Sequence, residues 1–180
     1  MGETKKPEQF SNEGKKAYQR NDYPEAARLY MLAAEAYDLS GDKINAAEMR
    51  NNSSVSSLKA GDASAALAAV EGTAAIFAEN GDVRRQGIAT GNYAAALEEL
   101  GRHDEAMVAY EEAADLFYSI GENDLRVHSM QALSAVQLQT GRRLQALASM
   151  KAGLDDIQHP NPKQRLLQKL LEIPFHILGR

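Results

Sequence analysis

Histidine and cysteine, the side chains that most often bind metals or take part in catalysis, are rare or absent in this sequence. The four histidines, which share no spacing typical of a metal site, are His103, His128, His159 and His176. Zinc sites usually combine cysteines and histidines at short spacings, such as two histidines four residues apart on one helix. Because the sequence contains no cysteine and no such histidine pair, we expect neither a metal ion nor a cofactor.

The remaining candidates for catalysis are equally weak. Glu98 and Glu99 are adjacent, so on a helix their carboxylates point about 100° apart, and we interpret such acidic pairs as a solvated face. Gly87 and Gly91 have the spacing of a close contact between helices, but they follow a helical pattern and not a strand, which excludes a dinucleotide-binding loop. No serine has the flanking glycines of a nucleophile elbow. We therefore expect that the protein is not an enzyme.

A regular comb of glycines shows how the chain is organised. The six comb glycines, which recur every 20 residues, are Gly41, Gly61, Gly81, Gly101, Gly121 and Gly141. Asn21 and Asn161 continue the same spacing at both ends. This spacing predicts repeated pairs of helices with a 40-residue period. We expect each of these glycines to end a helix in the left-handed conformation. We expect Pro7 to open the first helix, and Asp22 and Asp82 to cap later ones.

The four 40-residue blocks share small side chains at the same places. Alanine lies five residues past each turn within a repeat, at Ala26, Ala66, Ala106 and Ala146. The first helix of each pair has a second small position, which holds Gly14, Ser54, Ala94 and Ser134. On a helix, these residues and the large apolar residues beside them form a stripe that admits a neighbouring helix. The pattern predicts an all-α fold in which each helix runs unbroken for about 16 residues.

At these positions the chain resembles the tetratricopeptide repeat family. The third block carries the family's order of small, turn, small, aromatic and small residues as Ala94, Gly101, Ala106, Tyr110 and Ala113. Armadillo and HEAT repeats also have periods near 40 residues, but the offset from glycine to alanine favours the tetratricopeptide type. In its 40-residue period the chain is similar to the long repeats of kinesin light chains and spindle-orientation adaptors. The resemblance implies a right-handed superhelical solenoid of antiparallel helix pairs, with four repeats and a C-terminal capping helix.

We expect one solenoid domain with short segments at its ends. The domain would cover residues 7–158, with repeats at about 7–40, 42–80, 82–120 and 122–158. Residues 1–6 are expected to be a frayed N-terminus, and residues 174–180 a short tail. A helix over residues 161–173 would place Leu166, Leu167, Leu170 and Leu171 on one face. That helix would cap the apolar end that a solenoid otherwise exposes.

The resemblance also indicates where a ligand would bind. In tetratricopeptide repeats, the first helices of successive pairs line a concave groove that receives a peptide. The positions of this chain on that face include Asn12, Lys15, Gln19, Asn51, Asn52, Lys59, Asn92, Glu99, His128 and Gln131. Asn12, Asn52 and Asn92 lie 40 residues apart, and an amide can both donate to and accept from a peptide backbone. Alternatively, these asparagines bond to the neighbouring helix and stabilise the stack.

Charge and composition narrow the class of partner. The formal net charge is −5 with both signs interspersed, so we expect no binding to nucleic acid or to an anionic membrane surface. No apolar run is long enough to insert into a membrane. We expect a cytoplasmic adaptor that binds a protein or peptide partner. One alternative is a structural protein that forms homo-oligomers through its C-terminal cap or tail, or through its open N-terminal end; a third class is an enzyme.

Overall fold

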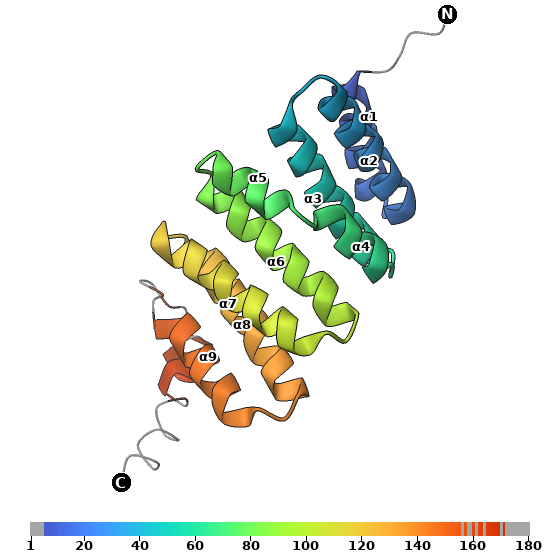
Figure 1. Ribbon diagram of the computed structural model, residues 1–180. Helices are drawn as coiled ribbons and strands as arrows, with labels where there is room; N and C mark the ends of the chain where they lie inside the picture. Colours follow the sequence, from blue (N-terminus) through green and yellow to red (C-terminus); the bar gives the residue numbers. More distant parts are fainter. Residues whose placement is uncertain are drawn as a thin grey trace, which may run out of the picture.

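The protein is a stack of helices (Figure 1). The computed structural model describes residues 6–155, 157, 160, 162–163, 165–169 and 171. The labelled helices are α1 (Pro7–Gln19), α2 (Tyr23–Leu39), α3 (Lys43–Lys59), α4 (Ala63–Val70), α5 (Thr73–Glu79), α6 (Val83–Glu99), α7 (His103–Ser119), α8 (Asn123–Gln139) and α9 (Arg143–Asp155). The described part of the chain contains no strand. The predicted all-α solenoid is therefore confirmed.

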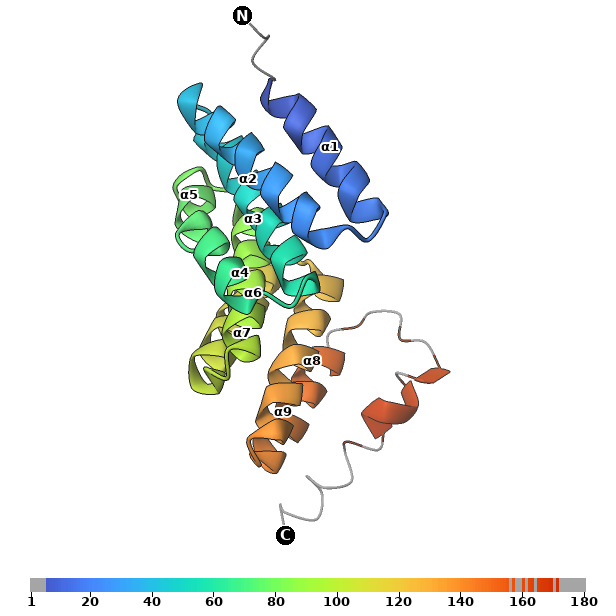
Figure 2. The same cartoon turned by 90° about the vertical axis from the view of Figure 1, so that its right-hand side faces the viewer.

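Helices that follow each other in the sequence pack against each other, so the pairs stack along the molecule (Figure 1). The pairs are α1 with α2, α3 with α4 and α5, α6 with α7, and α8 with α9. In the side view, α1 and α8 lie to one side of the stack, and α5 and α7 lie to the other (Figure 2). We call the side formed by α1, α3, α6 and α8 the first-helix face. The side formed by α2, α4, α5, α7 and α9 is the second-helix face.

The glycine comb ends the helices in one common way. The six comb glycines have φ between 70° and 79°, and Asn21 has φ of 61° at the equivalent turn of the first pair. Glycine adopts this left-handed conformation without steric cost. At the end of α5, the backbone N–H of Asp82 donates to the carbonyl oxygen of Phe77 at 2.9 Å. This bond belongs to the Schellman motif, which satisfies carbonyls at the end of a helix.

Aspartates then open several of the helices as N-caps. The side chains of Asp22 and Asp82 accept from the backbone N–H of Glu25 and Arg85, at 3.4 and 2.9 Å. Both caps were expected from the sequence. The bond from the Arg85 backbone, which stabilises the ionised carboxylate, lowers the pKa of Asp82.

The shared small residues are buried where the helices pack. Ala26, Ala66 and Ala106 have no exposed surface, and Ala146 exposes 1%. On the first helix of the first pair, a Cβ added to Gly14 would lie 3.2 Å from the ring of Tyr30. The helices pack closely there because Gly14 has no side chain and leaves room for this ring. The predicted burial of the four alanines is confirmed.

The second pair departs from the expected pattern. We expected one continuous helix between two comb glycines, but the structure has α4 and α5 there. The backbone of Glu71 is extended, with φ of −54° and ψ of 129°, and Gly72 has a left-handed φ of 77°. These two residues interrupt the helix, and the hydroxyl of Thr73 donates to the carbonyl oxygen of Val70 at 2.7 Å. The expectation of an unbroken helix was wrong because it counted only the regularly spaced glycines.

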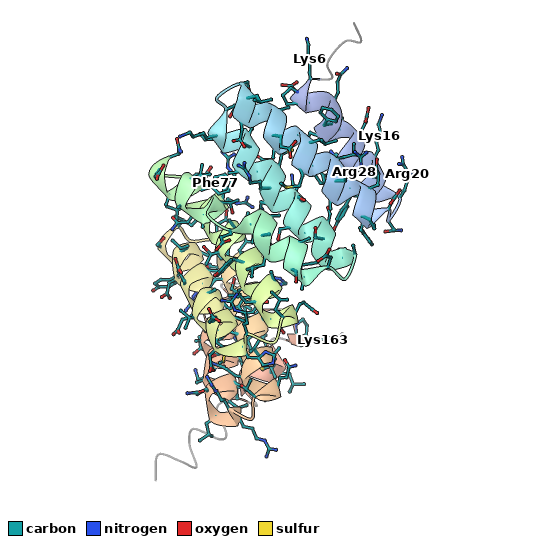
Figure 3. The ribbon with its side chains drawn as sticks, turned by 45° about the vertical axis from the view of Figure 1, so that its right-hand side comes forward. Lys6, Lys16, Arg20, Arg28, Phe77 and Lys163 are labelled. Carbon is teal, nitrogen blue, oxygen red and sulfur yellow. The ribbon has the colours of Figure 1, made fainter. Side chains whose placement is uncertain are left out.

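Phe77 holds α5 in the stack after this break. Its side chain is 1% exposed and belongs to a buried cluster with Ala47, Val70 and Ala89. The guanidinium carbon of Arg85 lies 5.4 Å from the centroid of the ring, which is a favourable cation–π distance. The position of Phe77 in α5 is labelled in Figure 3.

Only part of the expected capping helix lies among the described residues. Residues 165–169 are helical. The side-chain amide of Gln168 donates to the carbonyl oxygen of Leu154 at 2.7 Å, so this segment contacts α9. The rest of the expected helix, at 161, 164, 170 and 172–173, lies outside the described residues, as do the expected tail at 174–180 and residues 1–5. The capping role stays a prediction.

Removal of residues 161–180 tests the capping role. We expect the truncated chain to expose the apolar side of its last pair, so that amide hydrogen exchange in α8 and α9 becomes faster. Exchange in α1 and α2, at the far end of the solenoid, is the internal control and should not change. If α8 and α9 keep their protection, the C-terminal segment is an appendage and not a cap.

Helices α6 and α7 approach each other closely at Gly87. A Cβ added there would lie 2.8 Å from Cε1 of Phe117, whose side chain is 3% exposed. One turn later, a Cβ on Gly91 would meet only the Cβ of Ala113, at 3.9 Å, which is an ordinary contact. The pair of glycines that the sequence indicated as a helix contact therefore lies against α7.

Gly87→Ala and Gly91→Ala form a matched pair of substitutions. Both remove the penalty of glycine inside a helix, about 0.5–1 kcal/mol. Only Gly87→Ala also forces the buried Phe117 ring to move, so it should be less stable than Gly91→Ala by about 1–3 kcal/mol. Urea unfolding of both variants measures the difference. Equal free energies of unfolding would show that Phe117 leaves more room at position 87 than the 2.8 Å distance indicates.

Candidate functional site

The ten positions expected to bind a ligand all lie on the first helices, but their exposure differs. The exposed ones are Asn12, Lys15, Gln19, Lys59, Glu99, His128 and Gln131. Asn52 and Asn92 are half-buried, and Asn51 is only 9% exposed. The exposed side chains can meet a partner without rearrangement of the fold, whereas Asn51 takes part in packing.

A hollow of about 160 Å³ lies on the first-helix face between α6 and α8. It brings together two of the expected residues, Asn92 and His128, and it includes neither Asn12 nor Asn52. The lining residues are Gly87, Ile88, Gly91, Asn92, Ala95, Tyr110, Phe117, Leu125, His128, Ser129 and Ala132. Polar groups therefore stand beside an apolar recess, an arrangement that suits a partner's side chain.

The amide of Asn92 is used inside the solenoid. Its Nδ2 donates to Oδ1 of Asn51 at 2.9 Å, which joins α6 to α3. The side chains of Asn12 and Asn52 have no hydrogen-bond partner among the described residues. The asparagine row is thus divided: Asn92 bridges neighbouring helices, while Asn12 and Asn52 keep amides that can bond to a ligand.

Next to the same hollow, one buried hydroxyl links two helices. The hydroxyl of Tyr110 donates to Oε2 of Glu98 at 2.7 Å. Burial, together with this carboxylate, raises the pKa of Tyr110 far above its ordinary value, and the hydrogen bond joins α7 to α6. Glu98, which we had interpreted as part of a solvated face, is instead the half-buried acceptor of this bond.

A larger hollow, of about 640 Å³, opens on the second-helix face beside the break between α4 and α5. Its lining comes from the break, from α6 and from α7: Val70, Glu71, Gly72, Ala74, Ala75, Ala89, Thr90, Tyr93, Asp104, Glu105, Val108, Ala109 and Glu112. None of the ten expected binding residues lies in it. The one sequence signal that could have indicated this site is Gly72, a glycine outside the comb.

The composition of the helices bears on the kind of site. In the part of the chain that the structure describes, no group of three or more His, Cys, Asp or Glu side chains could hold a metal ion. No helix in that same part is long and apolar enough to cross a membrane. His159 and His176 lie outside the described residues.

Comparison with known families agrees with the helical-repeat interpretation. Residues 7–151 match the family described as "Soluble NSF attachment protein, SNAP". This range begins at the start of α1 and ends within α9, so it includes residues of all four helix pairs. No individual curated protein matches the chain. The match supports a helical repeat of the tetratricopeptide-like kind.

A double-mutant cycle at Asn51 and Asn92 tests the bridge. Each alanine substitution should lower the free energy of unfolding by about 1 kcal/mol, and the double variant should lose less than the sum of the two. Asn12→Ala is the matched control: it removes an exposed amide with no partner and should change stability by less than about 0.5 kcal/mol. Strictly additive losses would mean that the two amides do not interact in solution.

Proposed function

The chain belongs to the soluble NSF attachment protein family, and we propose that it is a non-catalytic adaptor that binds a partner protein on its first-helix face. The family is named for attachment and not for a reaction, which supports a binding role. The same name makes NSF the first partner to test. A protein or peptide ligand, rather than a small substrate, is the ligand we expect.

The exposed polar row on the first helices is the observation that carries this proposal. Asn12, Lys15 and Gln19 on α1, and His128 and Gln131 on α8, are all exposed. They offer donors and acceptors that the fold itself does not need. Beside His128, the hollow between α6 and α8 offers apolar surface where a side chain of the partner can be buried.

The arrangement of the chain as successive helical repeats supports an extended binding surface. We propose repeats of the long tetratricopeptide type, as in kinesin light chains, at 7–40, 42–80, 82–120 and 122–158, followed by a cap at 161–173. The left-handed glycines at 20-residue spacing support these boundaries. Even the break between α4 and α5 leaves Gly81 in the left-handed conformation, so the spacing continues into α6.

We propose the cytoplasm as the place of action. A chain without cysteines needs no oxidising compartment for disulfide formation. Its formal net charge of −5 opposes binding to phosphate backbones, so we propose no role in nucleic-acid recognition.

Self-assembly through the C-terminal end is a second candidate function. Leu138, Leu144 and Leu166, which are near the C-terminal end of the sequence, are 52%, 64% and 60% exposed, and exposed apolar side chains are available for contact with a second copy. Sedimentation equilibrium on the full chain and on a chain that lacks residues 175–180 separates the two functions. A dimer that dissociates on truncation supports self-assembly through the tail, whereas a monomer in both cases excludes it.

The adaptor proposal is tested by NSF binding to surface variants. His128→Ala combined with Gln131→Ala removes two exposed polar groups from the first-helix face and should weaken binding of purified NSF about tenfold. The matched control is Glu35→Ala combined with Gln145→Ala, which alters exposed residues of α2 and α9 on the other face and should bind as the unchanged protein does. Surface plasmon resonance measures all three dissociation constants.

Two outcomes would contradict this proposal. If the unchanged protein does not bind NSF, the partner is wrong. If both double variants bind as tightly as the unchanged protein, or both lose affinity equally, the partner does not dock on the first-helix face. Thermal melts of the variants exclude unfolding as the cause of any loss.

A further inference from the structure

The larger hollow exists where the second-helix face is interrupted. Its wall on one side is formed by residues 70–72, 74 and 75, at the break, and on the other side by α7. Ala89, Thr90 and Tyr93 of α6 also line it. At about 640 Å³ it lies within the range of sites that bury a ligand, roughly 300–1,000 Å³. This space is large enough to take a bulky side chain of another molecule.

The charged residues that line this hollow are all acidic. Its carboxylates are Glu71, Asp104, Glu105 and Glu112, and no lysine or arginine lines it. Two of them are already paired, since Glu105 bonds to Arg102 at 2.6 Å and Asp104 to Arg142. No ion pair joins Glu71 or Glu112 to a described residue, but the charge of Arg102 interacts with that of Glu71.

A second hollow continues this surface along α7. It is lined by Val108, Glu111, Glu112, Asp115, Leu116 and Ser119, and it shares Val108 and Glu112 with the larger one. Val108 is 67% exposed although it is a β-branched apolar residue. We call the two hollows together the acidic strip. Apolar contact surface and carboxylates alternate along it.

We propose that the acidic strip is a docking site for a basic segment of a partner protein, which inserts one bulky apolar side chain beside the α4–α5 break. Lysine or arginine residues next to that side chain lie against Glu71 and Glu112. This complementarity of charge selects a basic partner and disfavours an acidic one. The site lies on the second-helix face and does not depend on the binding proposed for the first-helix face.

The arrangement of charged residues also argues against two other occupants of the strip, a metal ion and the tail of a second copy. A metal ion needs several carboxylates or histidines around one point, and no such group occurs among the described residues. The tail of a second copy carries Phe175, Ile177 and Leu178 next to Arg180, but Glu172 precedes them, so its charge is mixed. A consistently basic segment fits the strip better.

A labelled peptide in which a leucine pair is flanked by lysines, with an amidated end, is the probe for this site. Fluorescence anisotropy at low and high salt should show binding that weakens with salt, because the contacts on the rim are ionic. Glu71→Gln and Glu112→Gln should each weaken binding about threefold or more. Glu35→Gln on α2 is the matched control, because it removes an exposed carboxylate from the same face but outside the strip.

A third variant and a second peptide test the apolar contact separately. Ala75→Phe fills the hollow without a change of charge, and Ala75 is exposed, so the fold should tolerate it. We expect at least about tenfold weaker binding, with an unchanged circular dichroism spectrum and melting temperature. A peptide with serines in place of the leucines should bind equally weakly to the unchanged protein and to this variant.

Three binding results would overturn the proposal. They are the absence of binding of the leucine peptide, equal binding of the leucine and serine peptides, and equal loss in Glu35→Gln and Glu112→Gln. Self-association that Ala75→Phe abolishes in sedimentation would make a second copy the occupant and also overturn it. Binding of NSF to the double variant His128→Ala with Gln131→Ala tests the first-helix face. Either proposal can therefore be contradicted while the other holds.

Discussion

A left-handed residue at every turn is the constraint on which this structure depends. Each comb glycine reverses the chain within about two residues, so successive helices are antiparallel and nearly equal in length. Helices α2, α3, α6, α7 and α8 each have 17 residues. Equal lengths keep equivalent positions of successive repeats on one face. For this reason Asn51 and Asn92, which are 41 residues apart, meet across two helices.

Close packing of small side chains, and not charge, holds the repeats together. The buried alanines and the contact between Gly14 and Tyr30 bring helix backbones near each other. Ion pairs between neighbouring repeats also occur, such as Arg84 with Glu122 at 2.8 Å. Because both of these side chains are substantially exposed, such a pair contributes less than about 1 kcal/mol. Its role is to align repeats that apolar contacts already join.

The break in the second pair gives the two faces of the solenoid different chemistry. On the first-helix face, helices run unbroken and present mixed polar groups around a small recess. On the second-helix face, one extra left-handed residue at Gly72 opens a larger hollow beside the acidic surface of α7. The two proposed binding surfaces therefore differ in size and in charge. Helices α6 and α7 contribute residues to the hollows on both faces.

The sequence by itself determined the features that depend on local rules. These are the helix ends at the comb glycines, the N-caps at Asp22 and Asp82, and the burial of small residues at repeated positions. Each follows from the backbone conformation or the periodicity of a short segment, so no knowledge of neighbours is needed.

Only the tertiary structure decided which glycines stay helical and which polar groups find partners. Gly87 lies inside a helix against Phe117, whereas Gly72 is left-handed and interrupts one. Glycine allows both conformations at similar cost, so the packing around it makes the choice. In the same way, Glu98 became the acceptor of Tyr110 because α7 places that hydroxyl beside it. Contacts between residues far apart in the chain are absent from any local pattern, and they shaped the hollows on both faces.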